Sequence, residues 1–132
     1  MSTVVPAGWP STRAPGPGAL QATDPADANR FLRYGGSPVP DQDTYPGHVA
    51  YQRDFAKSHQ AFQSIRLDET VVRGVPAVDW EFEWNAPEGR RHVHSIYWHA
   101  QGYEYFVYAS SLAERWPQTE PILDVMLSHA TP

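Results

Sequence analysis

The stretch Ala77-Val-Asp-Trp-Glu-Phe-Glu-Trp84 decides the fold, because its apolar and acidic residues alternate strictly. Such alternation places every second side chain on the same face of a β-strand. One face of this strand is apolar and carries Val78, Trp80, Phe82 and Trp84. The other face is acidic and carries Asp79, Glu81 and Glu83. The stretch therefore predicts a strand with its apolar side against a core, in a register that a one-residue slip would invert.

Two further strands are expected after short turns, at residues 90–99 and 103–109. They carry three more apolar residues that are expected on the face of the sheet opposite Trp80: Ile96, Trp98 and Val107. A sheet that is apolar on both faces needs cover on both faces. We therefore expect helices on each side of an antiparallel sheet.

The rest of the chain supplies the remaining elements. Shorter strands are expected at residues 19–23, 30–34 and 63–73. Residues 46–61 predict a helix, because four rings recur at helical spacing on one face: Tyr51, Phe55, His59 and Phe62. The order of elements is typical of an α+β fold.

The C-terminal part is expected to be helical in two pieces. Ser111 and Glu114 fit a capping box, in which each side chain bonds the backbone N–H of the other. The short helix that they open should end before Pro117. A second helix is expected to begin at Thr119 or Glu120, with the next proline in its first turn.

A chain of 132 residues corresponds to one domain. We divide it into a Pro/Gly-rich N-terminal segment at residues 1–18 and a single domain at residues 19–132. The expected fold class of that domain is α+β, with a mostly antiparallel sheet covered by helices on both faces.

Charge and composition exclude several classes of function. The net charge of −5 argues against a nucleic-acid partner, which would need a basic surface. It also argues against direct contact with an anionic membrane. The chain has no cysteine, which excludes a disulfide, a thiol nucleophile and a cysteine-bound metal. No apolar run approaches the roughly 18 residues of a membrane helix, and no signal peptide is evident.

The central stretch resembles a known family when it is read from Arg73-Gly-Val-Pro to Trp84 and onward. The same resemblance continues through His92-Val-His94, Gly102-Tyr-Glu-Tyr-Phe-Val-Tyr108 and Trp116. Upstream it includes Val5-Pro-Ala-Gly-Trp9, Asp24-Pro25 and Arg30-Phe-Leu-Arg-Tyr34. These motifs are similar to the C-terminal extracytoplasmic domain of actinobacterial membrane serine/threonine protein kinases.

The resemblance implies a PsbP-like α/β/α sandwich and a non-catalytic sensor or binding role outside the cell, tethered to the membrane through a parent kinase. The kinase motifs themselves are absent, so this chain is not expected to be an enzyme and needs no cofactor. Two alternatives remain. One is a free-standing secreted or surface binding protein of the same fold, and the other is a small metal-dependent enzyme.

The enzyme alternative depends on a patch of carboxylates and histidines. If Trp84 lies opposite Arg91, Glu83 pairs with His92 and Glu81 pairs with His94, with Cβ atoms about 5 Å apart. Three interpretations of this patch are open. It is a solvated face with modest ion pairs, a divalent-metal site, or a switch that responds to pH.

A second candidate site is aromatic. Trp84, Trp98, Tyr103 and Tyr105 lie on neighbouring expected strands and could present rings to a ligand. The alternative is that these rings form the core and cover the sheet. The partners that would suit an exposed aromatic surface are a cell-wall fragment, a small ligand or another protein.

Overall fold

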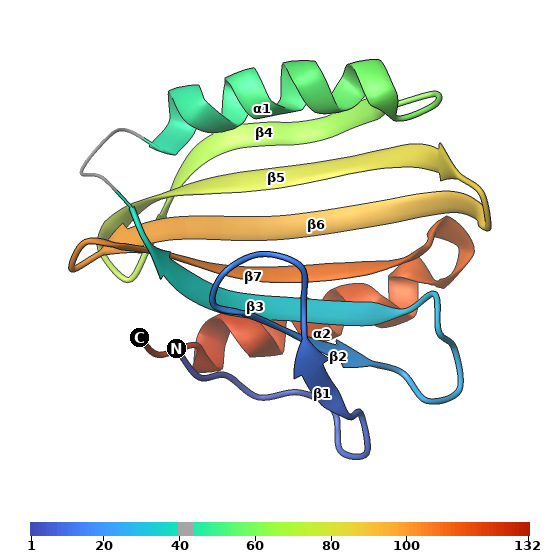
Figure 1. Cartoon of the computed structure of the whole chain (residues 1–132), viewed down its shortest axis with the longest axis horizontal. Helices are drawn as coiled ribbons and strands as arrows, with labels where there is room; N and C mark the ends of the chain where they lie inside the picture. The colour runs from blue at the N-terminus through green and yellow to red at the C-terminus, as the bar shows by residue number, and fades with distance from the viewer. Residues whose placement is uncertain (40–43) are drawn as a thin grey trace.

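The computed structural model describes residues 1–39 and 44–132. Figure 1 shows a long, twisted sheet with helices packed against it. In chain order the elements are β1 (Ser11–Arg13), β2 (Ala19–Thr23), β3 (Phe31–Pro38), α1 (Thr44–Ser58), β4 (Gln63–Val72), β5 (Val75–Ala86), β6 (Gly89–Ala100), β7 (Tyr103–Leu112), the 3-10 turn η1 (Ala113–Arg115) and α2 (Trp116–His129).

The seven described strands form one sheet in the order β1-β2-β3-β7-β6-β5-β4, and every neighbouring pair is antiparallel. Trp84 lies opposite Arg91, so the register expected from the turn is confirmed. That register places Trp98 on the face opposite Trp80, which confirms that both faces of the sheet are apolar. The sheet therefore has two sets of core contacts.

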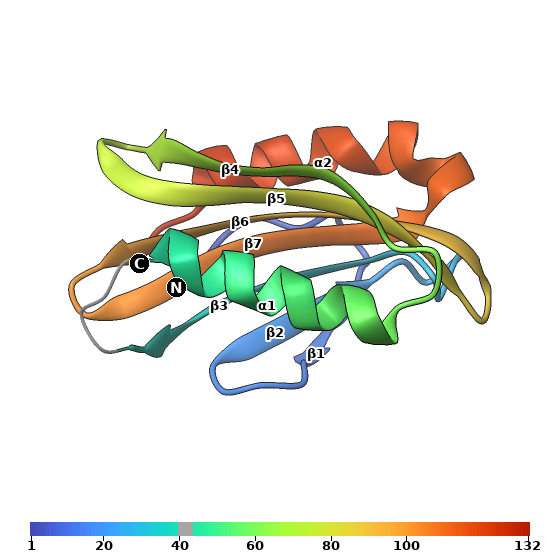
Figure 2. The same cartoon turned by 90° about the horizontal axis from the view of Figure 1, so that it is seen from above.

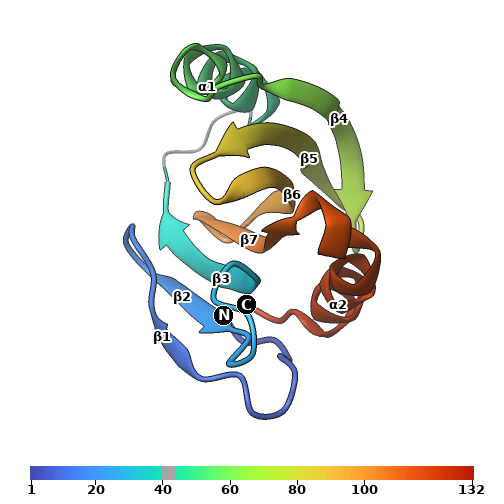
Figure 3. The ribbon, with the colours of Figure 1, turned by 90° about the vertical axis from the view of Figure 1, so that its right-hand side faces the viewer.

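The helix α1 packs against the Trp80 face. The ring of Phe55 lies 5.7 Å from that of Trp80 and 5.0 Å from that of Phe82, measured between centroids. Figure 2 shows α1 running along the length of the sheet, and Figure 3 shows it end-on, with α1 and α2 on different sides of the sheet. The contacts of α1 thus cover the apolar face of β5, the strand that strict alternation predicted.

The helix α2 packs against the face of the sheet that carries Trp98. Leu123 and Met126 are fully buried in one cluster with Leu32, Trp98 and Val107. This cluster holds most of the buried apolar residues that the structure describes, so it is the main source of hydrophobic stabilisation.

Three predictions about the helices are wrong. The first helix spans Thr44–Ser58, not 46–61, because His59 Nδ1 contacts the Phe55 carbonyl at 2.7 Å and Ala61 takes a φ of 53°. The turn that this conformation makes leads directly into β4.

The capping box at Ser111 is also wrong. Ser111 is fully buried in β7, and its hydroxyl donates to the Leu112 carbonyl instead of capping a helix. The short helix does end before Pro117, as η1, but the next helix begins at Trp116 instead of Thr119 or Glu120 and has Pro117 in its first turn. A proline there costs nothing, because its missing N–H would have no partner within the helix.

The N-terminal residues contact both the strand β2 and the residues next to the C-terminus. The strand β1 pairs with β2, and Ser2 forms a β-bridge with Thr131 beside the C-terminus. Trp9 packs against the core cluster that α2 covers. Residues 1–18 therefore make specific contacts with residues 19–132. None of the helices formed by residues 1–39 and 44–132 is both long enough and apolar enough to cross a bilayer.

Candidate functional site

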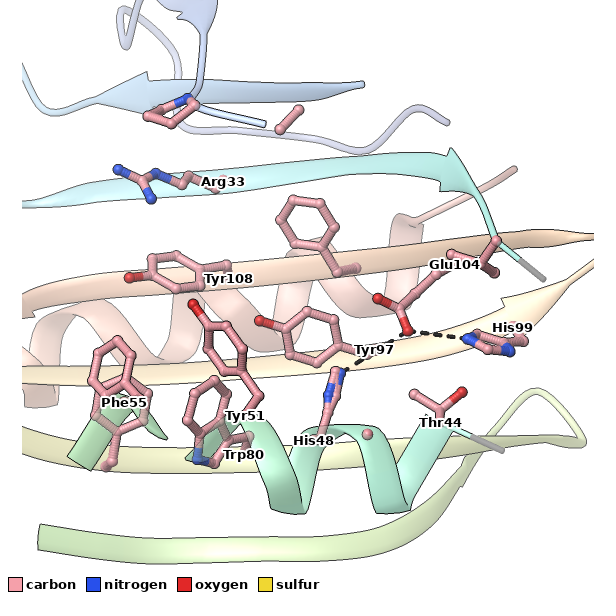
Figure 4. Close-up of a pocket in the computed structure, with 16 residues that line it drawn as sticks. Arg33, Thr44, His48, Tyr51, Phe55, Trp80, Tyr97, His99, Glu104 and Tyr108 are labelled. Carbon is pink, nitrogen blue, oxygen red and sulfur yellow. Dashed lines mark hydrogen bonds and ion pairs between the residues drawn. The ribbon is translucent and has the colours of Figure 1, made fainter. Parts of the chain in front are cut away.

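A pocket of about 500 Å³ lies between α1 and the face of the sheet that carries Trp80 (Figure 4). Its walls are mainly aromatic and come from α1 and from the strands β5, β6 and β7. The rings are those of Tyr51, Phe55, Trp80, Phe82, Tyr97, Phe106 and Tyr108. A concave site with aromatic walls and a few polar groups is the usual form of a small-molecule binding site.

One end of the pocket holds an acid between two histidines. His99 Nε2 lies 3.0 Å from Glu104 Oε2, and His48 Nε2 lies 4.0 Å from the same oxygen. His48 Nε2 is buried and has no hydrogen-bond partner among residues 1–39 and 44–132. Burial lowers the pKa of His48, so this ring is neutral at pH 7 and has one nitrogen to offer a ligand.

Three phenols converge on the middle of the pocket, those of Tyr51, Tyr97 and Tyr108 (Figure 4). Burial raises the pKa of Tyr97 and of Tyr108, so both hydroxyls stay protonated and can donate. At the opposite end from Glu104, Arg33 lies 5.5 Å from the centroid of the Tyr108 ring and donates to Gln21 Oε1 at 2.9 Å. The pocket thus offers neutral donors between a cation and an anion.

The sequence does not predict this pocket. Its lining comes from β3, α1, β5, β6 and β7, and no two of its polar residues form a recognisable motif. The only available signal was the face of the first helix, where Tyr51 and Phe55 were expected to be apolar contacts. The contribution of Glu104 follows only from the pairing of β6 with β7, which sets His99 opposite it.

The carboxylate–histidine patch lies on the other face of the sheet, and the expected pairs are confirmed. Glu81 lies opposite His94, and Glu83 lies opposite His92. His92 Nδ1 is 2.6 Å from Glu83 Oε2, and its Nε2 is 2.6 Å from Glu81 Oε2. The strand register therefore assembles the four predicted residues into one cluster.

The interpretation of this patch as a solvated face is wrong. Glu81, His92 and His94 are each no more than 7% exposed. The Trp116 ring at the start of α2 stacks on His92, with 4.2 Å between centroids and 16° between planes. An unpaired charge would be costly at such a site, so the close carboxylate–histidine contacts are needed for folding.

A third acid extends the cluster. His94 Nε2 lies 2.6 Å from Asp79 Oδ1, and Arg66 from β4 lies 3.3 Å from Asp79 Oδ2. Burial alone would raise the pKa of Asp79, but the hydrogen bonds and charges of His94 and Arg66 hold it below its usual value. Asp79 is therefore ionised at neutral pH and accepts a hydrogen bond from each neighbour.

Three of the four aromatic residues proposed as a ligand surface are brought together, Trp98, Tyr103 and Tyr105, and Trp84 lies apart from them. Trp98 and Tyr105 are 3% and 7% exposed and belong to the core cluster under α2. Tyr103 is exposed and stacks on Tyr105. Trp84 is half-buried on the other face, where its ring meets His59 edge-on. The burial of Trp98 and Tyr105 matches the alternative, in which these rings form part of the core.

Comparison with known proteins gives a family and a fold. A family model described as "Serine/threonine kinase C-terminal domain" matches residues 2–132. No curated protein matches the chain in sequence.

Several solved structures resemble the chain. The solution structure of cyanobacterial PsbP from Synechocystis has a TM-score of 0.72 and 18% identity, over 96% of this chain and 83% of that one. LpqN of Mycobacterium tuberculosis, described as involved in cell envelope biogenesis, has a TM-score of 0.65 and 16% identity, over 97% of this chain and 80% of that one. A Pseudomonas aeruginosa protein of unknown function has a TM-score of 0.64 and 14% identity, over 97% and 88%. At these identities the likeness establishes a PsbP-like fold alone.

Proposed function

The chain belongs to the serine/threonine kinase C-terminal domain family, and from this premise we propose that it is a non-catalytic ligand-binding sensor domain. In this proposal the domain lies outside the cell and is tethered to the membrane through a parent kinase. Its fold is a PsbP-like α/β/α sandwich, in which α1 covers one face of the sheet and α2 covers the other.

The observation that carries the proposal is the pocket under α1. It is large enough for a compact ligand, and its aromatic walls would contact an apolar ring or the face of a sugar. The phenols of Tyr97 and Tyr108 supply neutral donors, and the free nitrogen of His48 adds a further polar contact. The ligand that fits this chemistry is a small fragment with several hydroxyl or amide groups, such as a piece of the cell wall.

Binding suits the pocket better than catalysis does. The described lining contains no serine, threonine or lysine beside a general base in hydrogen-bond contact, as a nucleophilic mechanism would need. Its acid, Glu104, already accepts a hydrogen bond from His99. The pocket residues therefore supply shape and polarity, and the response to a ligand would be carried by the parent protein.

A binding screen on the purified chain tests this proposal. We expect muropeptides or small hydroxylated aromatic compounds to raise the thermal unfolding temperature and to shift the NMR resonances of α1 and β7. The paired variants Y97F and Y108F remove one donor each without removing the ring, and they should weaken binding. Y103F removes an exposed hydroxyl outside the pocket and should leave binding unchanged. Ligand binding that is equally strong in all three variants would contradict the assignment of the site.

A separate experiment tests the location and the parent protein. Native cells are separated into soluble, membrane and secreted fractions and probed with an antibody against this domain. A membrane band much larger than 14.8 kDa supports a tethered kinase, whose autophosphorylation then reports on ligands. A band of the chain's own size in the medium supports the free-standing secreted binding protein instead.

A further inference from the structure

We propose that the buried cluster on the α2 face is a Zn²⁺ site whose ligands are His94 Nδ1 and the carboxylates of Glu81 and Glu120. This site is separate from the pocket under α1, so it goes beyond the sensor function and stands or falls independently of it. The three side chains place ligand atoms within 4.8 Å of one another.

The state of His94 is the observation that carries the inference. Its Nε2 atom lies 2.6 Å from Asp79 Oδ1, so Nε2 carries the ring hydrogen and donates a hydrogen bond to the carboxylate. The other nitrogen, Nδ1, then presents a lone pair. This Nδ1 atom is buried and has no hydrogen-bond partner among residues 1–39 and 44–132. A buried polar atom without a partner is costly, and a bound cation would satisfy it.

Glu81 faces the same lone pair. Its Oε1 atom lies 3.9 Å from His94 Nδ1, which is too far for a hydrogen bond but close to the separation of two ligands around one zinc ion. Its other oxygen accepts from His92 Nε2 at 2.6 Å. One carboxylate oxygen is thus held by a neighbour while the other remains available to a metal.

Glu120 completes the set from outside the sheet. It stands in the first half of α2 and is exposed, whereas Glu81 and His94 are buried in β5 and β6. A metal bound by all three would join the helix to the sheet. Three protein ligands leave a fourth tetrahedral position open to water.

His92 is excluded as a ligand, although the sequence placed it beside His94 in a His-x-His pattern. Both of its ring nitrogens lie 2.6 Å from carboxylate oxygens, one from Glu83 and one from Glu81. Neither nitrogen has a lone pair directed at a metal. His92 instead orients Glu81, in the way that outer groups around metal sites usually fix the ligands.

The local charge favours a cation. Four carboxylates, those of Asp79, Glu81, Glu83 and Glu120, surround the cluster. Three groups oppose them: His92, both of whose nitrogens face carboxylates, and two arginines. Arg66 lies 3.3 Å from Asp79 and 3.8 Å from Glu81, and Arg90 lies 3.2 Å from Glu83. The carboxylates still outnumber these three groups. Arg66 is 45% exposed and can turn toward solvent when a metal enters. An imidazole nitrogen among the ligands selects zinc and its neighbours over Ca²⁺ and Mg²⁺.

Titration of the EDTA-treated full chain with ZnCl₂ tests the inference by calorimetry, and Co²⁺ provides a visible spectrum as a second readout. We expect one equivalent of Zn²⁺ to bind, the spectrum of tetrahedral Co²⁺, and an unfolding temperature that rises with metal concentration. Absence of Zn²⁺ binding up to about 1 mM would overturn the proposal.

Variants assign the ligands. E120Q changes an exposed side chain, so the protein should fold normally and bind Zn²⁺ more than about 10-fold more weakly. E114Q removes the same charge from an exposed residue of η1 and should bind like the parent chain. D79N replaces the carboxylate that faces His94 Nε2 with a neutral amide and should weaken binding about 10- to 100-fold. Equal affinity in E120Q and E114Q would place the ion elsewhere and overturn the assignment.

Discussion

Trp80 Nε1 donates a hydrogen bond of 2.8 Å to Gln52 Oε1, which ties the middle of β5 to α1. This bond matters because no residue of α1 is fully buried. The helix is held mainly by aromatic contacts with the sheet, among them the edge-on packing of Tyr51 and Phe55 on the Trp80 ring. The attachment of α1, and with it the shape of the pocket, depends on Trp80.

We therefore expect Trp80→Ala to lower the free energy of unfolding by about 3–5 kcal/mol, as other large-to-small changes in a core do. Trp80→Phe keeps a ring in the cluster and loses the bond to Gln52, so it should cost far less, about 1 kcal/mol beyond the lost volume. Urea unfolding followed by circular dichroism measures both. Equal stability of the alanine variant and the parent chain would show that this face is not a core.

The strand that contains Trp80 also shows which features of the fold can be predicted from the sequence and which cannot. Strict alternation predicted its two faces, and the short turn after it predicted the register that pairs Glu81 with His94. What alternation cannot show is the depth of the acidic face. Its burial comes from Trp116, which follows β7 by only a 3-10 turn and stacks on His92. Trp116 and His92 are far apart in sequence, and only the path of α2 brings them together.

The prediction of a helix cap at Ser111 is wrong for a different reason. Ser111 and Pro117 carry strong local signals, yet β7 continues through Ser111 because its partner His92 extends the ladder on β6. Tertiary pairing thus overrode a local capping preference. The pocket could not be predicted from the sequence for the same reason, because His48 approaches Glu104 only when α1 packs on the sheet.

A second prediction concerns Arg30, which is 9% exposed between the β2–β3 loop and α2. Its guanidinium donates to Thr119 Oγ1 at 3.0 Å, to Asp24 Oδ2 at 3.1 Å and to the Gln118 carbonyl at 2.9 Å. Arg30→Ala leaves Asp24 buried without its cation, and we expect a loss of about 3 kcal/mol in thermal or urea unfolding.

Arg30→Lys is the matched comparison. Lysine keeps the charge, but its single nitrogen cannot reproduce the contacts that three guanidinium nitrogens make with three separate acceptors. It should recover only part of the lost stability. Full recovery would mean that the charge alone, without the hydrogen bonds to α2, holds this corner of the fold.

A third prediction concerns pH and His48. Burial lowers the pKa of His48 in the folded protein, with Glu104 opposing this effect and His99 adding to it. The unfolded chain keeps the ordinary pKa of about 6.5, so it binds the proton first as the pH falls. The contribution of His48 to stability is therefore complete above about pH 6.5 and declines as the pH falls toward the folded pKa.

His48→Gln removes this titration and keeps a polar side chain of similar reach. The difference in unfolding free energy between the parent chain and this variant should change in favour of the variant as the pH is lowered from 8 through about 6.5. Urea unfolding at a series of pH values measures it. A constant difference across that range would mean that His48 titrates alike in both states.

The last prediction concerns the end of α2, whose final carbonyls have no partners within the helix. Arg73, in the turn between β4 and β5, donates from its guanidinium to the carbonyls of Leu127 and Ser128 at 2.9 Å each, and also to that of Ala130. Arg73 achieves this with a φ of 47°, a left-handed conformation that glycine adopts more readily. Arg73→Ala loses the cap and keeps the backbone cost, so we expect a loss of about 1–3 kcal/mol. Arg73→Gly loses the same cap but relieves the backbone, so it should be more stable than Arg73→Ala. If the glycine variant is instead the less stable of the two, the left-handed turn costs little and the cap alone explains why an arginine stands there.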